Sequence, residues 1–273
     1  MEILLLIVVG FLAGLLGALL GIGGGSIIVP ILVIFLNYPM HTAVSIGLIT
    51  IIATSISVAH VNILKGLVNL ELIYTLEIVT VIAAFFGGFT GNLINESILK
   101  VIFGIILIII SVSYIKESIK PNIIKTVIAN KTSPFYDEYY DPDLKEFVGY
   151  SPVNILQTLF ISSLAGVASG MLGIGGGVFK VPAMNILSKI PIKVAIATSN
   201  YMIGLTAAAG AIPYIIYGKV SPSASIYMVV GVILGSKFAL SKFSKITDKK
   251  LKILFAAFLM FIALQMLYKG FFK

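Results

Sequence analysis

The sequence contains no cysteine and no tryptophan, its 19 basic residues are all lysine, and only 11% of its 273 residues are charged. A chain without cysteine forms no disulfide, no thiolate metal site, no iron–sulfur cluster and no cysteine nucleophile. A chain without arginine lacks the bidentate guanidinium groups that commonly read nucleic acids, so we expect no nucleic-acid partner. Soluble domains are about 25% charged, and this chain therefore cannot cover its surface for water.

The sequence is instead rich in hydrophobic residues, which make up 59% of it and give a mean hydropathy of +1.09. A helix needs about 20 apolar residues to cross a bilayer. Two shorter apolar runs, at 26–36 and 178–187, are too short to span. We predict an all-α polytopic protein of the cell membrane with the lipid bilayer around it. The longer runs lie at 3–20, 42–64, 72–93, 98–115, 155–172, 194–217, 224–243 and 251–267.

A polar segment separates the apolar runs into two series of four. It includes an acidic and aromatic stretch at 135–143, which is typical of a solvated linker. We therefore predict a first membrane repeat at 1–116, a polar cytoplasmic linker at 117–150 and a second membrane repeat at 151–273.

The two series share one sequence pattern. Residues 14–30 read GLLGALLGIGGGSIIVP and residues 166–182 read GVASGMLGIGGGVFKVP. The register then continues without a gap, so that Pro39 matches Pro191. Self-similar halves in a membrane protein are typical of a duplicated transporter unit.

Lysine placement favours an inverted arrangement of the two repeats. Basic residues gather on the cytoplasmic side of a membrane. If each half crossed four times, nine lysines would lie on one side of the membrane and ten on the other. If each half opens with a re-entrant hairpin and then crosses about three times, only four of the 19 lie on one side. Those four are Lys100, Lys219, Lys269 and Lys273.

The glycine clusters at 21–25 and 173–177 predict a helix that breaks within the membrane and restarts. Each glycine costs a helix about 1 kcal/mol relative to alanine. A restarted helix presents free N–H groups and the positive end of its dipole, which suit an anion. The alternative is that these glycines serve only close helix packing. We predict a substrate site formed by Gly23, Gly24, Gly25, Ser26, Gly175, Gly176, Gly177, Lys180, Thr198, Ser199 and Asn200.

Several of these residues have an equally simple structural explanation. Lys180 stands within an apolar segment, where it either completes an anion site or extends its ammonium to the membrane interface. Thr198, Ser199 and Asn200 follow the second break and could line an oxyanion path, although hydroxyl groups also bond back to their own helix.

His60 and Glu77 are candidates for proton coupling, because histidine titrates near neutral pH and intramembrane carboxylates are expensive. The alternative is that each faces lipid headgroups or a helix partner. No catalytic constellation, metal-ligand spacing or Walker motif is present in the sequence, so we expect no enzyme activity, no cofactor and no metal site.

The doubled pattern G-xx-G-xx-G-x-GGG-xxx-VP resembles that of the sulfite exporter TauE/SafE family of membrane permeases. The segment 195–199, AIATS, is similar to that family's A-x-A-T-S motif, whereas the first half has AVSIG at 43–47. The resemblance implies a secondary transporter that exports sulfite or an organosulfonate such as sulfoacetate. An anion channel and a non-transporting scaffold subunit are the alternatives, and small-xxx-small patterns would allow a homodimer.

Overall fold

The computed structural model describes residues 2–119, 130–141, 144–242 and 249–272, and helices dominate them. The part before the linker contains α1 (Glu2–Leu20), α2 (Gly25–Ile34), α3 (Met40–Leu64), α4 (Leu70–Leu93) and α5 (Glu96–Ile119). The part after it contains α6 (Ile155–Leu172), α7 (Gly177–Pro182), the π-helical η1 (Ala183–Leu187), α8 (Ile192–Ile216), α9 (Pro222–Lys242) and α10 (Lys249–Phe272).

Both predicted helix breaks are present. In each half a long helix ends at the glycine cluster, and a short helix begins five residues later. Gly23, Gly24, Gly175 and Gly176 all have positive φ, between 70° and 83°, a backbone region that side chains with a Cβ rarely adopt. The local sequence therefore breaks the helix because only glycine takes these turns without strain.

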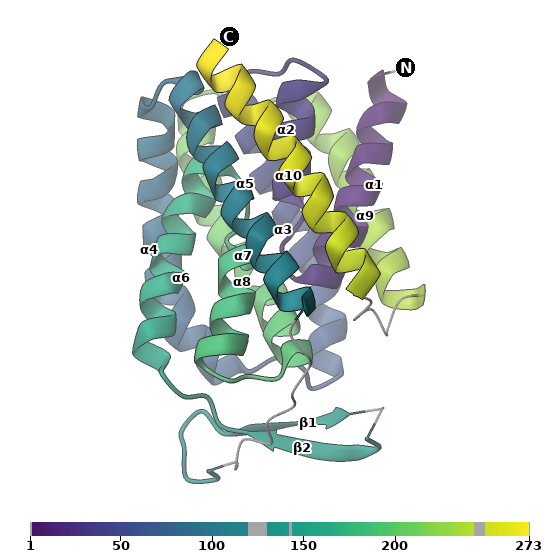
Figure 1. Ribbon diagram of the computed structural model, residues 1–273, viewed down its shortest axis with the longest axis vertical. Helices are drawn as coiled ribbons and strands as arrows, with labels where there is room; N and C mark the ends of the chain where they lie inside the picture. Colours follow the sequence, from purple (N-terminus) through teal and green to yellow (C-terminus); the bar gives the residue numbers. More distant parts are fainter. Residues whose placement is uncertain (1, 120–129, 142–143, 243–248, 273) are drawn as a thin grey trace.

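The helices pack in matched pairs. The first helix of one half packs on the fourth of the other, so α1 lies against α9 and α6 lies against α4. The central helices α3 and α8 contact each other, and α5 packs along α10. Figure 1 shows α5 and α10 running in opposite directions across the front of the bundle, with both chain termini at the upper end. A parallel repeat and an inverted repeat both produce these pairs, so the duplication and its orientation stay predictions.

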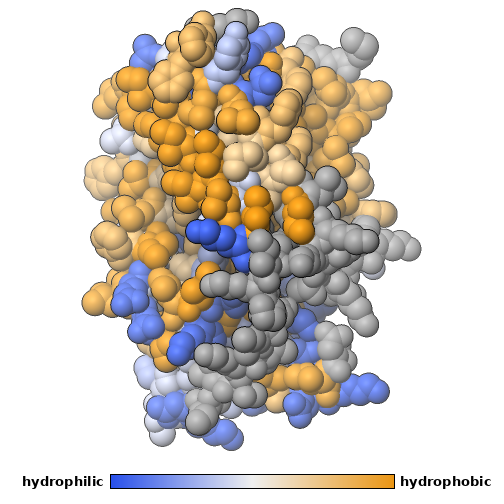
Figure 2. Space-filling view, viewed as in Figure 1, coloured by the Kyte–Doolittle hydropathy of each residue, from blue (hydrophilic) through white to orange (hydrophobic). Residues whose placement is uncertain are grey.

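The prediction of an all-α polytopic membrane protein is confirmed. Among the described residues, seven helices are long and apolar enough to cross a membrane. Large hydrophobic side chains such as Ile56, Phe86 and Leu156 are exposed on the outside of the bundle. Figure 2 shows hydrophobic residues over much of the upper and middle part of one face, with hydrophilic residues more frequent toward the lower end.

The polar linker contains a small ordered piece. The strands β1 (Asp137–Asp141) and β2 (Glu146–Tyr150) pair antiparallel and form a hairpin below the helices (Figure 1). On β1 the buried Tyr139 alternates with the exposed Tyr140, as the two-residue period of a strand requires. Residues 120–129 of the predicted linker lie outside the described residues, and the three-part division of the chain stays a prediction.

Candidate functional site between two helix breaks

The two glycine breaks touch each other in the middle of the bundle. A Cβ atom on Gly25 would overlap the carbonyl oxygen of Gly173, and one on Gly177 would overlap the carbonyl oxygen of Gly21. These contacts are equivalent in the sequence register of the two halves. Close packing, the alternative explanation for the glycines, is therefore observed at Gly25 and Gly177. It does not exclude binding, because separating the two breaks would uncover the same backbone.

The restarted helix α2 begins with a polar side chain that lacks a partner. Ile27 and Ile28 donate their N–H groups to the carbonyl oxygen of Gly24, so hydrogen bonding within the helix begins there. Ser26 is fully buried, and its hydroxyl oxygen has no hydrogen-bond partner. An unsatisfied buried hydroxyl costs free energy, and such a group beside a helix N-terminus is available to an anion.

Two of the predicted site residues on α8 bond the first break or the last turn of α1 before it. Ser199 donates its hydroxyl hydrogen to the carbonyl oxygen of Gly21 over 2.8 Å, and the side-chain amide of Asn200 donates to that of Ala18 over 3.0 Å. The amide oxygen of Asn200 is buried without a partner. Thr198 points elsewhere, since its hydroxyl oxygen accepts the backbone N–H of Asn69 at the start of α4. The structure thus brings Ser199 and Asn200 to the first break and the turn before it, and leaves Thr198 apart.

Lys180 is fully buried and paired. Its Nζ lies 2.8 Å from Oε2 of Glu77 on α4 and 2.8 Å from the hydroxyl oxygen of Thr206 on α8. Thr206 also donates a hydrogen bond to the other carboxylate oxygen of Glu77. The alternative in which Lys180 extends to the membrane interface is therefore wrong, because the side chain has no exposed surface. The two charged side chains can be buried only because they and the Thr206 hydroxyl hydrogen-bond one another.

Glu77 does not face headgroups either, since only 3% of its surface is exposed. Sequence reasoning considered Lys180 and Glu77 separately and missed both their pairing and Thr206. One signal for the pair was present, because intramembrane ionisable residues of opposite sign usually find each other. Nothing local to either residue identified the partner, which lies 103 residues away.

The two histidines lie away from this cluster. His60 is exposed near the end of α3. His41 lies near the start of α3, where its Nε2 is 3.1 Å from the carbonyl oxygen of Gly91 and its Nδ1 is 3.4 Å from the carboxylate of Glu96. The proton-coupling hypothesis for His60 therefore has no contact with Glu77 to support it. Within the described ranges, no group of three or more His, Asp or Glu residues is placed to hold a metal ion.

The hairpin docks on the end of the bundle below Lys180. Tyr139 and Tyr150 are buried in one apolar cluster with Leu76 of α4 and Val181 of α7. The Tyr150 hydroxyl accepts a hydrogen bond from the Asn69 side chain over 3.1 Å and donates one to Asp137. Burial, reinforced by the neighbouring Asp137 carboxylate, raises the pKa of Tyr150. The linker therefore covers this end of α4 and α7.

A second tether joins the hairpin to α8. Lys193 and Asp141 form an ion pair with 2.9 Å between Nζ and Oδ1. The carboxylate of Asp141 also accepts a hydrogen bond from the hydroxyl of the buried Tyr139. The hairpin is thus fixed to the first turn of α8 as well as to α4.

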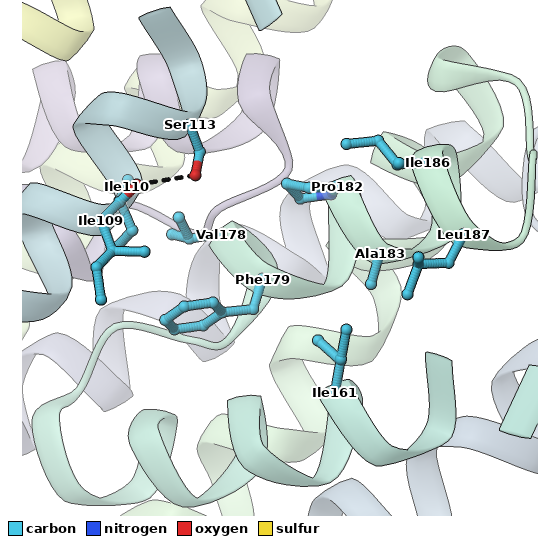
Figure 3. A pocket seen from close by; sticks show the side chains of 10 residues that line it. All are labelled: Ile109, Ile110, Ser113, Ile161, Val178, Phe179, Pro182, Ala183, Ile186 and Leu187. Atoms are coloured by element: carbon cyan, nitrogen blue, oxygen red, sulfur yellow. Dashed lines mark hydrogen bonds between the residues drawn. The ribbon is translucent and has the colours of Figure 1, made fainter. Parts of the chain in front are cut away.

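A cavity of about 270 Å³ lies between α5, α6 and the α7–η1 segment (Figure 3). Its lining is apolar apart from Ser113, whose hydroxyl donates to the carbonyl oxygen of Ile109. An anion would find no free donor there, so this cavity is not the predicted site. The lining residues are Ile109, Ile110, Ser113, Ile161, Val178, Phe179, Pro182, Ala183, Ile186 and Leu187.

Comparisons with known proteins agree with this architecture. Residues 6–266 match the family model described as Sulfite exporter TauE/SafE. The chain is 30% identical to the Bacillus subtilis protein named "Probable membrane transporter protein YunE", over all of both chains. It is also 30% identical to a probable membrane transporter protein of Methanocaldococcus jannaschii, over 96% of this chain and 94% of that one. No solved structure gives a significant match.

Proposed function

Since the chain belongs to the sulfite exporter TauE/SafE family and is a membrane transporter of that type, we propose that it carries a small sulfur oxyanion across the cell membrane. Sulfite and organosulfonates such as sulfoacetate are the proposed substrates, and export is the proposed direction. The linker at 117–150 would lie on the cytoplasmic side. The predicted homodimer stays a prediction.

One observation carries this proposal: the two matched breaks meet in the middle of the bundle. Gly25 contacts Gly173 and Gly177 contacts Gly21, and these contacts would close a path between the halves. Separating the breaks would expose the first N–H groups of α2 and the unpartnered hydroxyl of Ser26. Transport by alternating access then follows if one half rocks against the other and uncovers the site from each side in turn.

The anion would find hydrogen-bond donors at this point. The Ser26 hydroxyl has no other acceptor, and the amide of Asn200 and hydroxyl of Ser199 come from α8. The Ser199 hydroxyl is bonded to the carbonyl oxygen of Gly21 in the first break, and the Asn200 amide to that of Ala18 in the last turn of α1. Both groups therefore become available only when this segment moves. The affinity for the oxyanion therefore rises when the two breaks separate.

The test is tracer flux in proteoliposomes with sulfite, sulfoacetate, sulfate or chloride. Ser26→Ala should raise the substrate concentration for half-maximal flux by about ten- to a hundredfold, because a hydrogen bond to a charged group contributes roughly 1.5–3 kcal/mol. Ser225→Ala is the matched control, since that hydroxyl is also buried and unpartnered but lies on α9, outside the predicted site. Equal effects of the two changes would argue against a site at the α2 terminus.

The same experiment separates the alternatives. A transporter saturates at rates set by its conformational change, which takes microseconds to milliseconds or longer. An anion channel would instead pass current far above such turnover. Absence of flux for all four anions, with folded protein in the vesicles, would contradict the transporter proposal and favour a scaffold subunit.

A further inference from the structure

Lys180, Glu77 and Thr206 form a neutral cluster from three elements that surround the second break. Lys180 stands three residues after Gly177 on α7, Glu77 lies on α4 and Thr206 on α8. The exposed fractions of the three residues are 0%, 3% and 0%, so no water screens them. The carboxylate accepts hydrogen bonds from both neighbours, and the ammonium donates to both. The cluster is therefore satisfied only while its two charges face each other.

No other charged group on the surrounding elements can replace Glu77. Helix α6, which packs along α4, has no ionisable residue, and α7 has only Lys180. Glu71 and Tyr74 are exposed, and Lys193 already bonds Asp141. The remaining ionisable side chains on α4 and α8 are Glu71, Tyr74, Lys193, Tyr201 and Tyr214.

The pair lies beside the contact between the two breaks. Val181, the residue after Lys180, would touch a Cβ on Gly21, and Gly177 faces the Ser199 hydroxyl. Lys180 is thus one helical turn from the contact between the breaks. It is the positive group on α7, the short helix that restarts there. An anion that enters this space is attracted to its ammonium.

An arriving anion cannot simply be added to the pair. Three charges would then share a water-free site, with two of them negative. Breaking a buried ion pair so that one charge is left uncompensated is strongly unfavourable. The cost is avoided if Glu77 becomes neutral when it loses Lys180.

Resting on the proposed anion transport, we propose that the substrate anion replaces Glu77 on Lys180 and that Glu77 takes up one proton in the same step. The ionic hydrogen bond between Nζ and Oε2 breaks, and one between Nζ and the anion forms. The proton comes from water on the open side and joins the released carboxylate, which then hydrogen-bonds Thr206 as a neutral acid. Anion and proton leave together when the ion pair re-forms.

This exchange makes the protein a proton–anion symporter with one proton per anion. For a monovalent anion, the two permitted states are the empty ion pair and the loaded site with protonated Glu77, because every intermediate contains an uncompensated buried charge. With a monovalent anion this exchange moves no net charge, so in a cell whose interior is more alkaline than its surroundings the proton gradient favours uptake. Export then requires an outward anion gradient that exceeds the inward proton gradient.

The experiment uses proteoliposomes with equal anion on both sides, a pH gradient and the membrane potential held at zero by potassium and valinomycin. Sulfate and chloride are anions of strong acids, and the carboxylate of sulfoacetate titrates near pH 4. All three therefore keep their charge between about pH 6 and 8. Wild-type protein should accumulate the anion on the alkaline side, up to about tenfold per pH unit for one coupled proton. Sulfite itself takes up a proton in this pH range. Its protein-coupled accumulation is therefore measured as the accumulation in wild-type vesicles minus that in Glu77→Gln vesicles.

Glu77→Gln should abolish accumulation while exchange of internal for external anion persists, because Lys180 can still bind the anion. Glu71→Gln is the matched control on the same helix and should accumulate the anion like wild type. Flux down an anion gradient without accumulation in wild-type vesicles overturns the symport and leaves anion transport standing. Accumulation that persists in Glu77→Gln also overturns it. Absence of any flux overturns the proposed function and this inference together.

Discussion

Gly25 lies against the carbonyl oxygen of Gly173, so closely that a Cβ atom on Gly25 would overlap it. The equivalent contact joins Gly177 to Gly21. Each break therefore uses a glycine of its short helix to touch the end of the long helix of the other half. These contacts are made between backbones, which cannot move aside as a flexible side chain does.

Gly25→Ala should lower the free energy of unfolding by about 3 kcal/mol, the upper end of the usual range for overpacking, because the obstacle is backbone. Gly66→Ala is the control: its φ of 63° strains alanine, but no atom lies within 4 Å of the added Cβ. That strain alone costs roughly 1–2 kcal/mol. Thermal unfolding of both variants is followed by circular dichroism of the purified proteins. This signal does not depend on tryptophan, which the chain lacks. A Gly25→Ala protein as stable as Gly66→Ala would contradict the close contact.

Lys180→Met should destabilise the protein by about 3–5 kcal/mol, because it leaves the buried Glu77 without its cationic partner. Adding Glu77→Gln should recover most of this loss, since the second change removes the charge that was left unpaired. The free energies of unfolding of wild type, both single variants and the double variant form a double-mutant cycle. Additive losses would show that the two side chains do not interact.

Tyr150→Phe should cost about 1–3 kcal/mol at neutral pH, because the hydroxyl bonds Asn69 and the Asp137 carboxylate. The pKa of Tyr150 is raised in the folded protein, so the neutral phenol is the form that folding favours. Its contribution is therefore complete below the ordinary tyrosine pKa of about 10 and is lost as the pH rises further.

The measurement is the difference in unfolding free energy between wild type and Tyr150→Phe from pH 8 to above pH 10. This difference should be constant at first and then shrink. Tyr140→Phe, on the exposed side of the same strand, is the control and should change little at any pH. A difference that grows with pH would contradict the predicted direction.

Lys269→Met should lower the free energy of unfolding by about 1–3 kcal/mol. The Lys269 ammonium on α10 bonds the carbonyl oxygens of Val33 and Ile34, at the carboxyl end of α2, and the side chain of Asn37. A cation at this end also offsets the helix dipole. Lys65→Met, an exposed lysine just after α3, should cost less. Equal losses of unfolding free energy in the two variants would contradict a stabilising contact of Lys269 with the end of α2.

The sequence predicted the helices and both breaks, because these depend on local chemistry. Apolar runs of membrane-spanning length form helices, and glycine clusters at 21–25 and 173–177 interrupt them wherever they fold. The β-hairpin in the linker has a weaker signal in the sequence. Tyr139 and Tyr140 are the same residue type, so the alternation of burial that marks this strand is not visible in the sequence.

The tertiary structure decided which polar residues meet. Thr198, Ser199 and Asn200 are adjacent in sequence, yet only the latter two bond the first break or the last turn of α1 before it, because successive residues of a helix point in different directions. Lys180 and Glu77 are 103 residues apart, and no local pattern links them. Their pairing follows from the packing of α4, α7 and α8, which removes water from both charges and leaves each as the other's partner.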